Sequence, residues 1–298
     1  MNIEEFGKIM VNELEGALGD EYEVEYKEML KNNSVVNHTI CIKKTDENIS
    51  PAIYIDSFYE EYKRGASIGK LVDDYIGIYR EHSPKEPIDM SFYTDFSNVV
   101  NNLSFKVVNK AGNEKILIDV PYREYEDLAL VPICLFESDE IGKGNIVIKN
   151  NHLDMWEISI EELWENVMEY SPVNSPVKLR DLLQLLEEIN KIKLPENTDE
   201  RRMIVAGNSN DFYGAGVIFY PGVLKELSER LGGDIFIIPS SVHEVIALKA
   251  CKEDKDGMSL RDIIKEVNTT TLEPKDFLSD NLYLYEAKAD KLRIYNEE

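Results

Sequence analysis

The chain is poor in basic side chains, and this shortage excludes the partners that depend on them. Its 298 residues include 33 lysines and arginines against 57 aspartates and glutamates, which gives a formal net charge of −24 at pH 7. Proteins bind nucleic acid through Lys and Arg contacts to phosphates, and docking on an anionic membrane surface needs the same cations. We therefore expect neither direct nucleic-acid binding nor membrane binding.

The acidic excess itself has two interpretations. Dispersed acidic residues keep a protein soluble, whereas a continuous array of carboxylates imitates DNA and occupies the basic groove of a nucleic-acid-binding protein. Here the acids are interleaved with Lys and Arg instead of forming one run, which favours the first interpretation. A DNA-mimic inhibitor remains an alternative function.

Cysteines and long apolar runs are also scarce. The three cysteines, Cys41, Cys134 and Cys251, are far apart in sequence and form no CxxC pair, as is typical of free thiols in a reducing compartment. The longest apolar run, residues 128–136, contains Pro132 and is too short to span a bilayer. The N-terminus has neither the basic nor the apolar region of a secretory signal. These features predict a cytoplasmic protein.

Sequence motifs for metals and cofactors are missing as well. The four histidines are scattered and form no H-E-x-x-H motif, and neither a G-x-G-x-x-G loop nor a Walker lysine occurs. Asp119 and the cluster Glu124, Glu126 and Asp127 lack the glycine and the ligand spacing of a calcium loop, so we interpret them as solvated loop acids. We expect no metal and no cofactor.

The chain does contain a regular alternation of short strands, turns and helices. Residues 203–248 show it most clearly, because they predict strand, turn, strand (residues 215–220), helix, strand, tight turn and strand. Pro221 suits the first turn of that helix, and Gly232 with Gly233 ends it.

Similar patterns cover the rest of the sequence. Apolar residues at helical spacing predict helices over residues 2–18, 68–82, 92–100, 160–168, 179–192 and 258–267, the last with Ser259 as its cap. Alternation and β-branched content predict strands over residues 21–26, 35–42, 51–55, 103–108, 115–120, 128–136, 145–148, 280–286 and 291–295. The first three strands are joined too closely for parallel crossovers, so they form an antiparallel meander. The predicted fold class is α+β, with mainly antiparallel sheets covered by helices in two or more lobes.

The best candidate for a linker is the segment at residues 171–176 (SPVNSP). Its two prolines disfavour helix, and its other residues are mostly small or polar. This linker divides the chain into an N-terminal α+β region, residues 1–173, and a C-terminal α+β domain, residues 174–298. A meander followed by helices occurs twice in the first region, which suggests two similar lobes, residues 1–87 and 88–173.

One segment concentrates reactive side chains at the end of a predicted strand. It contains Ser240, Ser241, His243 and Glu244. A hydroxyl, an imidazole and a carboxylate are the groups of a nucleophile, its base and an orienting acid, so a hydrolase using Ser240 or Ser241 with His243 is one interpretation. No G-x-S-x-G elbow surrounds either serine. The spacing of Ser241 and Glu244 also fits a capping-box turn, in which His243 is a packed turn residue.

Aromatic residues lie near the ends of predicted loops: Phe58, Tyr59, Tyr62, Phe212 and Tyr213. They are compatible with a partner-binding surface, although core packing is the commoner explanation for most such rings. Tyr213 joins Ser240, Ser241, His243 and Glu244 as the candidate binding residues.

Four segments of the sequence resemble a known family: residues 51–59 (PAIYIDSFY), 220–224 (YPGVL), 238–245 (IPSSVHEV) and 277–283 (FLSDNLY). The family consists of uncharacterised bacterial proteins, a domain of unknown function common in anaerobic Gram-positive gut bacteria. The resemblance extends over nearly the whole chain. It implies no substrate and no catalytic residue.

Our leading expectation is therefore a non-enzymatic protein that binds an unknown protein or small-molecule partner. It follows mainly from the missing cofactor, metal and nucleophile motifs, and from a charge unsuited to nucleic acid.

Overall fold

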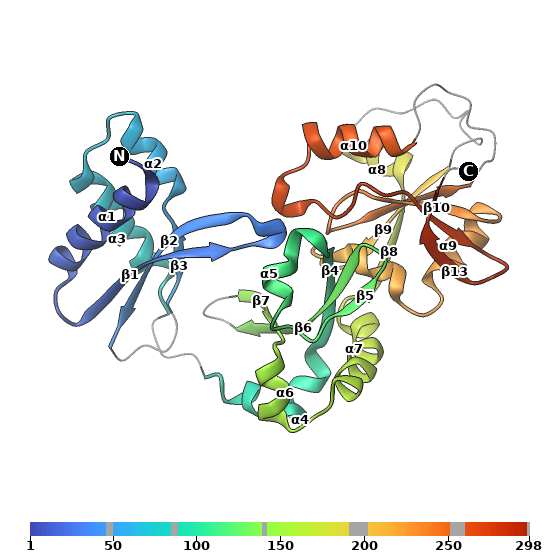
Figure 1. The fold of residues 1–298 in the computed structure, drawn as a ribbon, viewed down its shortest axis with the longest axis horizontal. Coiled ribbons are helices and arrows are strands. Elements are labelled where there is room, and N and C mark those ends of the chain that lie inside the picture. Colours follow the sequence, from blue (N-terminus) through green and yellow to red (C-terminus); the bar gives the residue numbers. More distant parts are fainter. Residues whose placement is uncertain (46–49, 85–88, 139–141, 191–201, 251–259, 297–298) are drawn as a thin grey trace. The chain divides into compact units, whose positions relative to one another are not determined.

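The computed structural model of this chain describes residues 1–45, 50–84, 89–138, 142–190, 202–250 and 260–296 (Figure 1). Contacts divide the chain into two compact units, residues 1–93 with 137–144 and residues 94–136 with 145–298. The domain boundary expected after residue 173 remains a prediction and falls inside the second unit. The sheets are mainly antiparallel and accompanied by helices, which confirms the α+β class.

The described part of the first unit combines a three-stranded meander with three α-helices. Its elements are α1 (Ile3–Leu18), β1 (Tyr22–Leu30), β2 (Val36–Lys44), β3 (Ala52–Tyr54), α2 (Asp56–Lys63) and α3 (Ile68–His82). The strands pair in the order β1-β2-β3, both pairs antiparallel, as the short connections predicted. A capping box starts α1, because Asn2 Oδ1 accepts the Glu5 amide at 2.8 Å while Glu5 Oε2 accepts the Asn2 amide at 3.0 Å.

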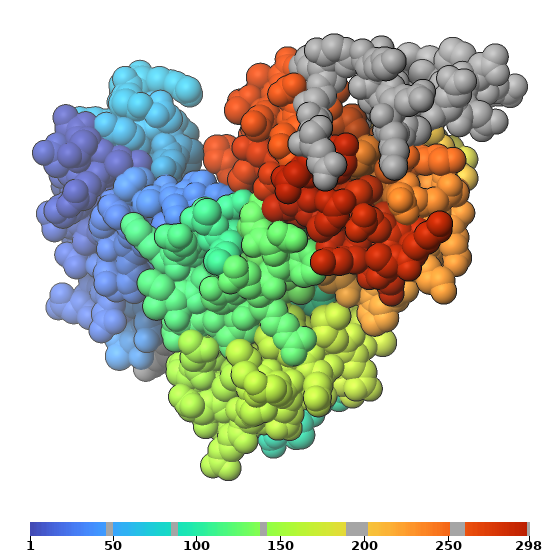
Figure 2. All heavy atoms as spheres, turned by 45° about the vertical axis from the view of Figure 1, so that its right-hand side comes forward, coloured from blue at the N-terminus to red at the C-terminus, as the bar shows by residue number. Residues whose placement is uncertain are grey.

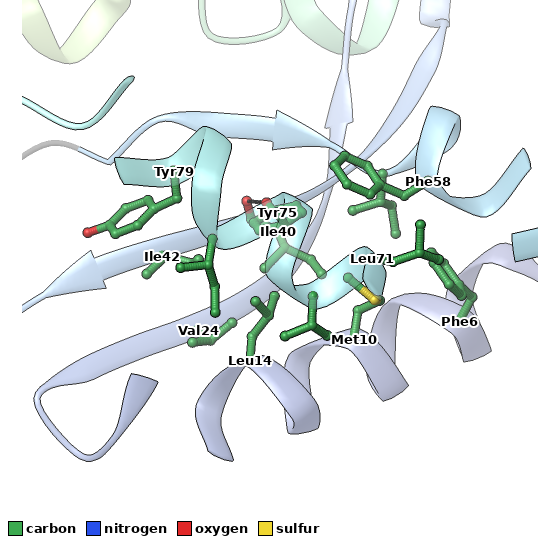
Figure 3. Close-up of a cluster of buried hydrophobic side chains, with 13 residues drawn as sticks. Phe6, Met10, Leu14, Val24, Ile40, Ile42, Phe58, Leu71, Tyr75 and Tyr79 are labelled. Atoms are coloured by element: carbon green, nitrogen blue, oxygen red, sulfur yellow. Dashed lines mark hydrogen bonds between the residues drawn. The ribbon is translucent and has the colours of Figure 1, made fainter. Parts of the chain in front are cut away.

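The apolar faces of α1, α3 and the sheet meet in one core (Figure 3). Tyr75 of α3 is fully buried in it, and its hydroxyl donates to the Ile40 carbonyl at 2.5 Å. This bond satisfies the polar end of a side chain whose burial raises its pKa well above the usual range. The rings of Tyr59 and Tyr62 pack against Phe6 at 5.5 and 5.3 Å between centroids, which places them at the core of this unit.

The second unit begins with most of a four-stranded sheet and its helices. Its elements are α4 (Phe96–Val99), β4 (Leu103–Asn109), α5 (Glu114–Leu117), β5 (Arg123–Tyr125), β6 (Leu128–Ser138), β7 (Gly142–Val147), α6 (Asn150–Trp156) and α7 (Ile160–Asn174). The strand order is β4-β6-β5, and β7 also pairs with β6. Residues 137–144, at the end of β6 and the start of β7, count with the first unit.

Two predictions for this part were wrong. Residues 115–120 were predicted as a strand, but Glu114–Leu117 form α5, and β4 pairs with β6. Most residues of β6 are buried, whereas of residues 115–120 only Leu117 and Val120 are, so β6 offers β4 the more apolar partner. The helix predicted over residues 92–100 is broken into short helical turns, among them α4.

The predicted linker is also incorrect, because its first four residues continue α7 despite Pro172. Side-chain hydrogen bonds stabilise this end of the helix. The buried Ser171 hydroxyl donates to the Val167 carbonyl at 2.5 Å, and Asn174 Nδ2 donates to the Leu103 carbonyl at 2.8 Å. These side-chain bonds, with the packing of α7 on β4, outweigh the proline's disruption of the helix.

A six-stranded antiparallel sheet completes the second unit. Its strands follow the order β13-β12-β10-β11-β9-β8, and with the helices between them they are β8 (Val177–Asp181), α8 (Leu182–Asn190), β9 (Met203–Asn208), α9 (Val223–Leu231), β10 (Ile235–Pro239), β11 (Val245–Lys249), α10 (Leu260–Thr270), β12 (Tyr283–Glu286) and β13 (Lys291–Ile294). The closing hairpin β12–β13 and the turn between β10 and β11 are confirmed. Ser259, expected to cap α10, lies outside the described residues.

Two predicted elements take another form here. Residues 179–192 were predicted as one helix, but the start of that range belongs to β8. Residues 215–220 were predicted as a strand, but Gly214–Phe219 form the 3₁₀ helix η6. Residues 214–218 are all buried, and an apolar run buried on every side has no periodicity that separates strand from helix.

The carboxylate of Asp127, between β5 and β6, binds the segment that leads into β12. Its oxygens accept hydrogen bonds from Ser279 Oγ at 2.6 Å, Asn281 Nδ2 at 3.0 Å and the Tyr283 hydroxyl. Nearby, the Tyr125 hydroxyl donates to the Leu292 carbonyl at 2.6 Å. Figure 2 shows the C-terminal segment, in red, against the green surface of this region. Asp127 is thus a fixed anchor instead of the solvated loop acid that we predicted.

Two glycines of α1 provide a matched test of the first core. A Cβ on Gly7 would lie 2.6 Å from the Tyr26 ring, whereas a Cβ on Gly16 meets nothing within 4 Å. We expect Gly7→Ala to destabilise the protein by about 1–3 kcal/mol through overpacking. Gly16→Ala should stabilise it by about 0.5–1 kcal/mol, because alanine favours helix. Urea unfolding followed by circular dichroism measures both changes, and equal stabilisation by both variants would contradict the packing described.

The Asp127 anchor predicts a large effect from one carboxylate. Asp127→Ala leaves the hydroxyl of the fully buried Tyr283 without its acceptor, and we expect a loss of about 3 kcal/mol in unfolding free energy. Both tryptophans, Trp156 and Trp164, lie in the second unit, so their fluorescence during urea unfolding reports on it. Glu124→Ala, which removes an exposed partner of Lys110, is the control and should change little. Equal effects of the two substitutions would rule out the anchor.

Candidate functional site

The segment from Asn208, the last residue of β9, to Tyr213 is held from within by one buried side chain. Asn208 is 5% exposed, and its Oδ1 accepts the Asn210 amide at 3.1 Å while its Nδ2 donates to the Phe212 carbonyl at 2.9 Å. The Asp211 amide donates back to the Asn208 carbonyl at 3.2 Å. These bonds give the loop, which we call the aromatic loop, one defined shape.

Two residues of the aromatic loop have left-handed backbone conformations. Asp211 has φ 52° and Tyr213 has φ 53°. Aspartate adopts this region fairly readily, but a bulky tyrosine seldom does. Between these two residues the Phe212 side chain is 51% exposed. The loop therefore keeps an apolar ring in solvent with a strained residue beside it.

The turn between β10 and β11, residues 240–244, lies against this loop. Its Ser241 amide donates to the Glu244 carbonyl at 3.1 Å, and the His243 amide donates to Ser241 Oγ at 3.0 Å. The predicted capping box is therefore wrong in detail. The serine hydroxyl accepts from the residue two positions on, in a turn that leads directly into β11 instead of a helix.

His243 joins three segments through its ring. Its Nδ1 accepts the Tyr213 amide at 3.2 Å, and its Nε2 lies 3.3 Å from Asp276 Oδ1 in η7 (Pro274–Asp276). A backbone amide can only donate, so Nδ1 carries no proton and the neutral ring is protonated at Nε2, facing the carboxylate. The ring stacks on Tyr213 at 5.8 Å and 19°, and it lies 5.2 Å from the Phe212 ring. We call Phe212, Tyr213 and His243 the ring cluster.

Backbone contacts hold the turn against η7 and against η6, which follows the aromatic loop. The Val242 amide donates to the Asp276 carbonyl at 2.9 Å, and the Val242 carbonyl accepts the Ala215 amide at 3.3 Å. Gly214 makes this approach possible, because a Cβ there would lie 2.5 Å from the His243 carbonyl oxygen and 2.6 Å from the Asn208 nitrogen. Only glycine fits at this position without moving main chain.

Charged side chains surround the ring cluster. The Lys106 ammonium lies 4.7 Å from the centre of the Tyr213 ring. Burial, with the Asp276 charge as a smaller cause, raises the pKa of Tyr213. On the strand β8, Lys178 binds Asp211 at 3.0 Å, and Arg180 Nη2 lies 3.7 Å from Glu244.

The structure brings together most of the residues that the sequence singled out. Tyr213 and His243 are bonded to each other, while Ser240, Ser241 and Glu244 belong to the turn that carries the histidine. Within the described residues, neither serine hydroxyl is bonded to the His243 ring. The assignment of these five residues to a binding site stays a prediction.

Sequence reasoning missed three contributors to this arrangement. Asp276 carried no signal, since 33 residues separate it from His243 and no pattern links them. Asn208 was interpreted only as part of a turn, although an Asx side chain that bonds its own loop is a known turn device. Lys106 lies on a strand far away in sequence, so its position beside Tyr213 follows only from the folded sheet.

The other acidic candidates lie elsewhere. Asp119 lies 3.6 Å from Lys149, and Glu124 binds Lys110 at 2.5 Å. Over the described ranges, no three His, Cys, Asp or Glu side chains gather closely enough to hold a metal ion. The described helices also include none with the length and apolar character needed to cross a bilayer.

Comparison with known proteins identifies a family whose function is unknown. No curated protein and no solved structure matches the sequence. The profile of a family of unknown function, DUF5688, matches residues 3–287. This match confirms the expected resemblance to a family of unknown function over nearly the whole chain. With nearly its whole length covered, the chain belongs to the family of unknown function DUF5688.

Proposed function

We propose that this protein is a non-enzymatic binding protein that recognises another protein through the ring cluster, with Phe212 as the anchor. The observation that supports the proposal most is the exposed Phe212 ring. Its loop is held by Asn208 hydrogen bonds and contains Tyr213 in a left-handed backbone conformation. Backbone strain of this kind persists where the surrounding structure enforces it, and such positions concentrate at functional sites. Large aromatic side chains supply much of the binding energy at protein interfaces.

The rigidity of the loop supports binding for a second reason. A side chain that is ordered before binding loses little conformational entropy when a partner covers it. Asn208 holds the main chain on both sides of Phe212, and the Phe212 ring already lies 4.1 Å from the Tyr213 ring. The ring cluster is therefore a preformed surface instead of one assembled by the partner.

The surroundings of the ring cluster resemble the rim of an interface. The ion pairs of Lys178 with Asp211 and of Arg180 with Glu244 flank an apolar centre. We place the protein in the cytoplasm, because Cys41 and Cys134 are free thiols, as expected in a reducing compartment. The net charge of −24 favours a protein partner over nucleic acid.

The hydrolase alternative is less well supported by the geometry. A histidine that activates serine must accept the hydroxyl proton on a free ring nitrogen. Here Nδ1 of His243 accepts an amide and Nε2 faces Asp276, while Ser241 Oγ accepts the histidine's own amide. The DNA-mimic alternative gains no specific observation, because many surface carboxylates, such as Glu4 and Asp74, are paired with lysines.

The proposal predicts that one substitution abolishes partner capture. Phe212→Ser removes the anchor without touching the bonds of Asn208 to the main chain, and we expect at least about a tenfold loss of affinity. Tagged wild-type and variant proteins would be used to recover partners from native lysate, with quantitative mass spectrometry. The partner identified with the wild type would then be purified and titrated against each variant.

Ile118→Ser is the matched control for this experiment. Ile118 is also a large apolar residue in the second unit, is 80% exposed, and is not part of the ring cluster. The control should recover the partner as the wild type does. Equal recovery by Phe212→Ser, or no stoichiometric partner in repeated trials, would refute the proposed surface.

A further inference from the structure

We infer that His243 is a proton-operated latch, whose protonation releases the Tyr213 amide and loosens the aromatic loop. The inference concerns the regulation of the ring cluster and rests on the proposed function for its biological meaning. Histidine is the side chain whose charge ordinarily changes between pH 5 and 8. The latch would keep the ring cluster formed at neutral pH and open it in mild acid.

The hydrogen-bond pattern around the ring supplies the physical reason. Nδ1 of His243 must be an acceptor, because its partner at 3.2 Å is the Tyr213 N–H. An imidazolium carries a proton on both nitrogens and accepts nothing. Protonation would therefore set two donors against each other at hydrogen-bond distance, and the Tyr213 amide would lose its acceptor.

The ring is expected to stay in place while the amide moves. On the other side of the ring, Nε2 faces Asp276 Oδ1 at 3.3 Å, and a charged donor strengthens a bond to a carboxylate. Asp276 is itself held to the turn, since its carbonyl accepts the Val242 amide. The imidazolium keeps a stronger hydrogen bond to Asp276 while it loses the one from the Tyr213 amide. The strained aromatic loop, and not the ring, is therefore expected to move.

Charges from every neighbouring segment act on this balance. The nearest charges are the Asp276 carboxylate of η7, which faces Nε2, and the Lys106 ammonium of β4, which lies over the Tyr213 ring. Other charges near these segments are paired: Lys178 with Asp211 and Arg180 with Glu244 between β8 and the loop or turn, and Lys275 of η7 with Glu273. The His243 side chain is 30% exposed, so protons reach it from solvent.

Release of this bond has a specific structural consequence. Tyr213 has φ 53°, a conformation that tyrosine rarely adopts, and its bond to His243 fixes it there. Without the bond the residue can relax, and the adjoining Phe212 ring leaves its position beside the imidazole. A partner bound through Phe212 would then dissociate as the pH falls.

Amide NMR on the full-length chain tests the latch without any partner. Selective ¹⁵N labelling of tyrosine gives signals from the sixteen tyrosines, and Tyr213→Phe identifies the signal of interest by its loss. We expect the Tyr213 signal to shift as one proton binds between pH 8 and 5, and its protection against deuterium exchange to fall at least about tenfold. The Tyr220 amide, bonded to the Val217 carbonyl at 3.0 Å, is the internal reference for an unaffected amide.

Two variants separate the latch from a general effect of acid. His243→Asn places an amide oxygen near the Nδ1 position and does not titrate, so its Tyr213 signal should be independent of pH. Asp276→Asn removes the carboxylate that faces Nε2 but keeps the Tyr213 contact, so its Tyr213 amide should still lose protection in acid. A Tyr213 signal that never departs from the Tyr220 reference would overturn the inference. A change that persists in His243→Asn, or that Tyr220 shares through unfolding, would overturn it equally.

The amide NMR experiment uses the protein without a partner, so a negative result there would not bear on the proposed binding function. Conversely, a Phe212→Ser variant that still captures the partner would remove the proposed function while the amide titration stood.

Discussion

The hydrogen bond from the Tyr213 amide to Nδ1 of His243 is the contact on which the candidate site depends. It joins the aromatic loop to the turn between β10 and β11, and it fixes the tautomer of the histidine. Gly214 allows the two segments to approach, because no other residue type fits between the Asn208 amide and the His243 carbonyl. The exposed Phe212 ring owes its position to this contact and to the Asn208 side chain.

The scaffold of the second unit positions the remaining partner of the histidine. Asp276 lies a few residues before Ser279 and Tyr283, whose side chains bind Asp127. The Asp127 anchor therefore fixes the segment from which Asp276 reaches the ring. A carboxylate between β5 and β6 thus supports a site that it does not touch, since η7 gains its place from both the anchor and the Val242 amide.

Elements with strong local signals could be predicted from the sequence. In four elements the local sequence pattern and the tertiary contacts favour the same structure. They are the capped helix α1, the meander, the helix α9 with its glycine stop and the hairpin β12–β13. The failures have a common cause. Long-range packing and side-chain hydrogen bonds determine the structure of three segments: η6, the end of α7 at Pro172 and the start of β8. The local periodicity of the sequence does not show such contacts.

The candidate site shows the same limit. Tyr213 and His243 stood out as reactive or aromatic residues near predicted turns, but Asp276 and Lys106 come from distant parts of the chain. The sequence can therefore indicate which turn contains reactive side chains, but it does not show which histidine nitrogen accepts a hydrogen bond. This hydrogen bond decides whether His243 is suited to act as a catalytic base or as a latch.

The position of the proton on the His243 ring tests the central hydrogen bond most directly. Long-range ¹H–¹⁵N correlation at pH 8 distinguishes the nitrogens of the four histidines, and His243→Asn assigns the relevant signals. The structure predicts a bare Nδ1 at His243, so that the neutral ring carries its proton on Nε2. A proton on Nδ1 would leave the Tyr213 amide without an acceptor and would contradict both the site and the latch built on it.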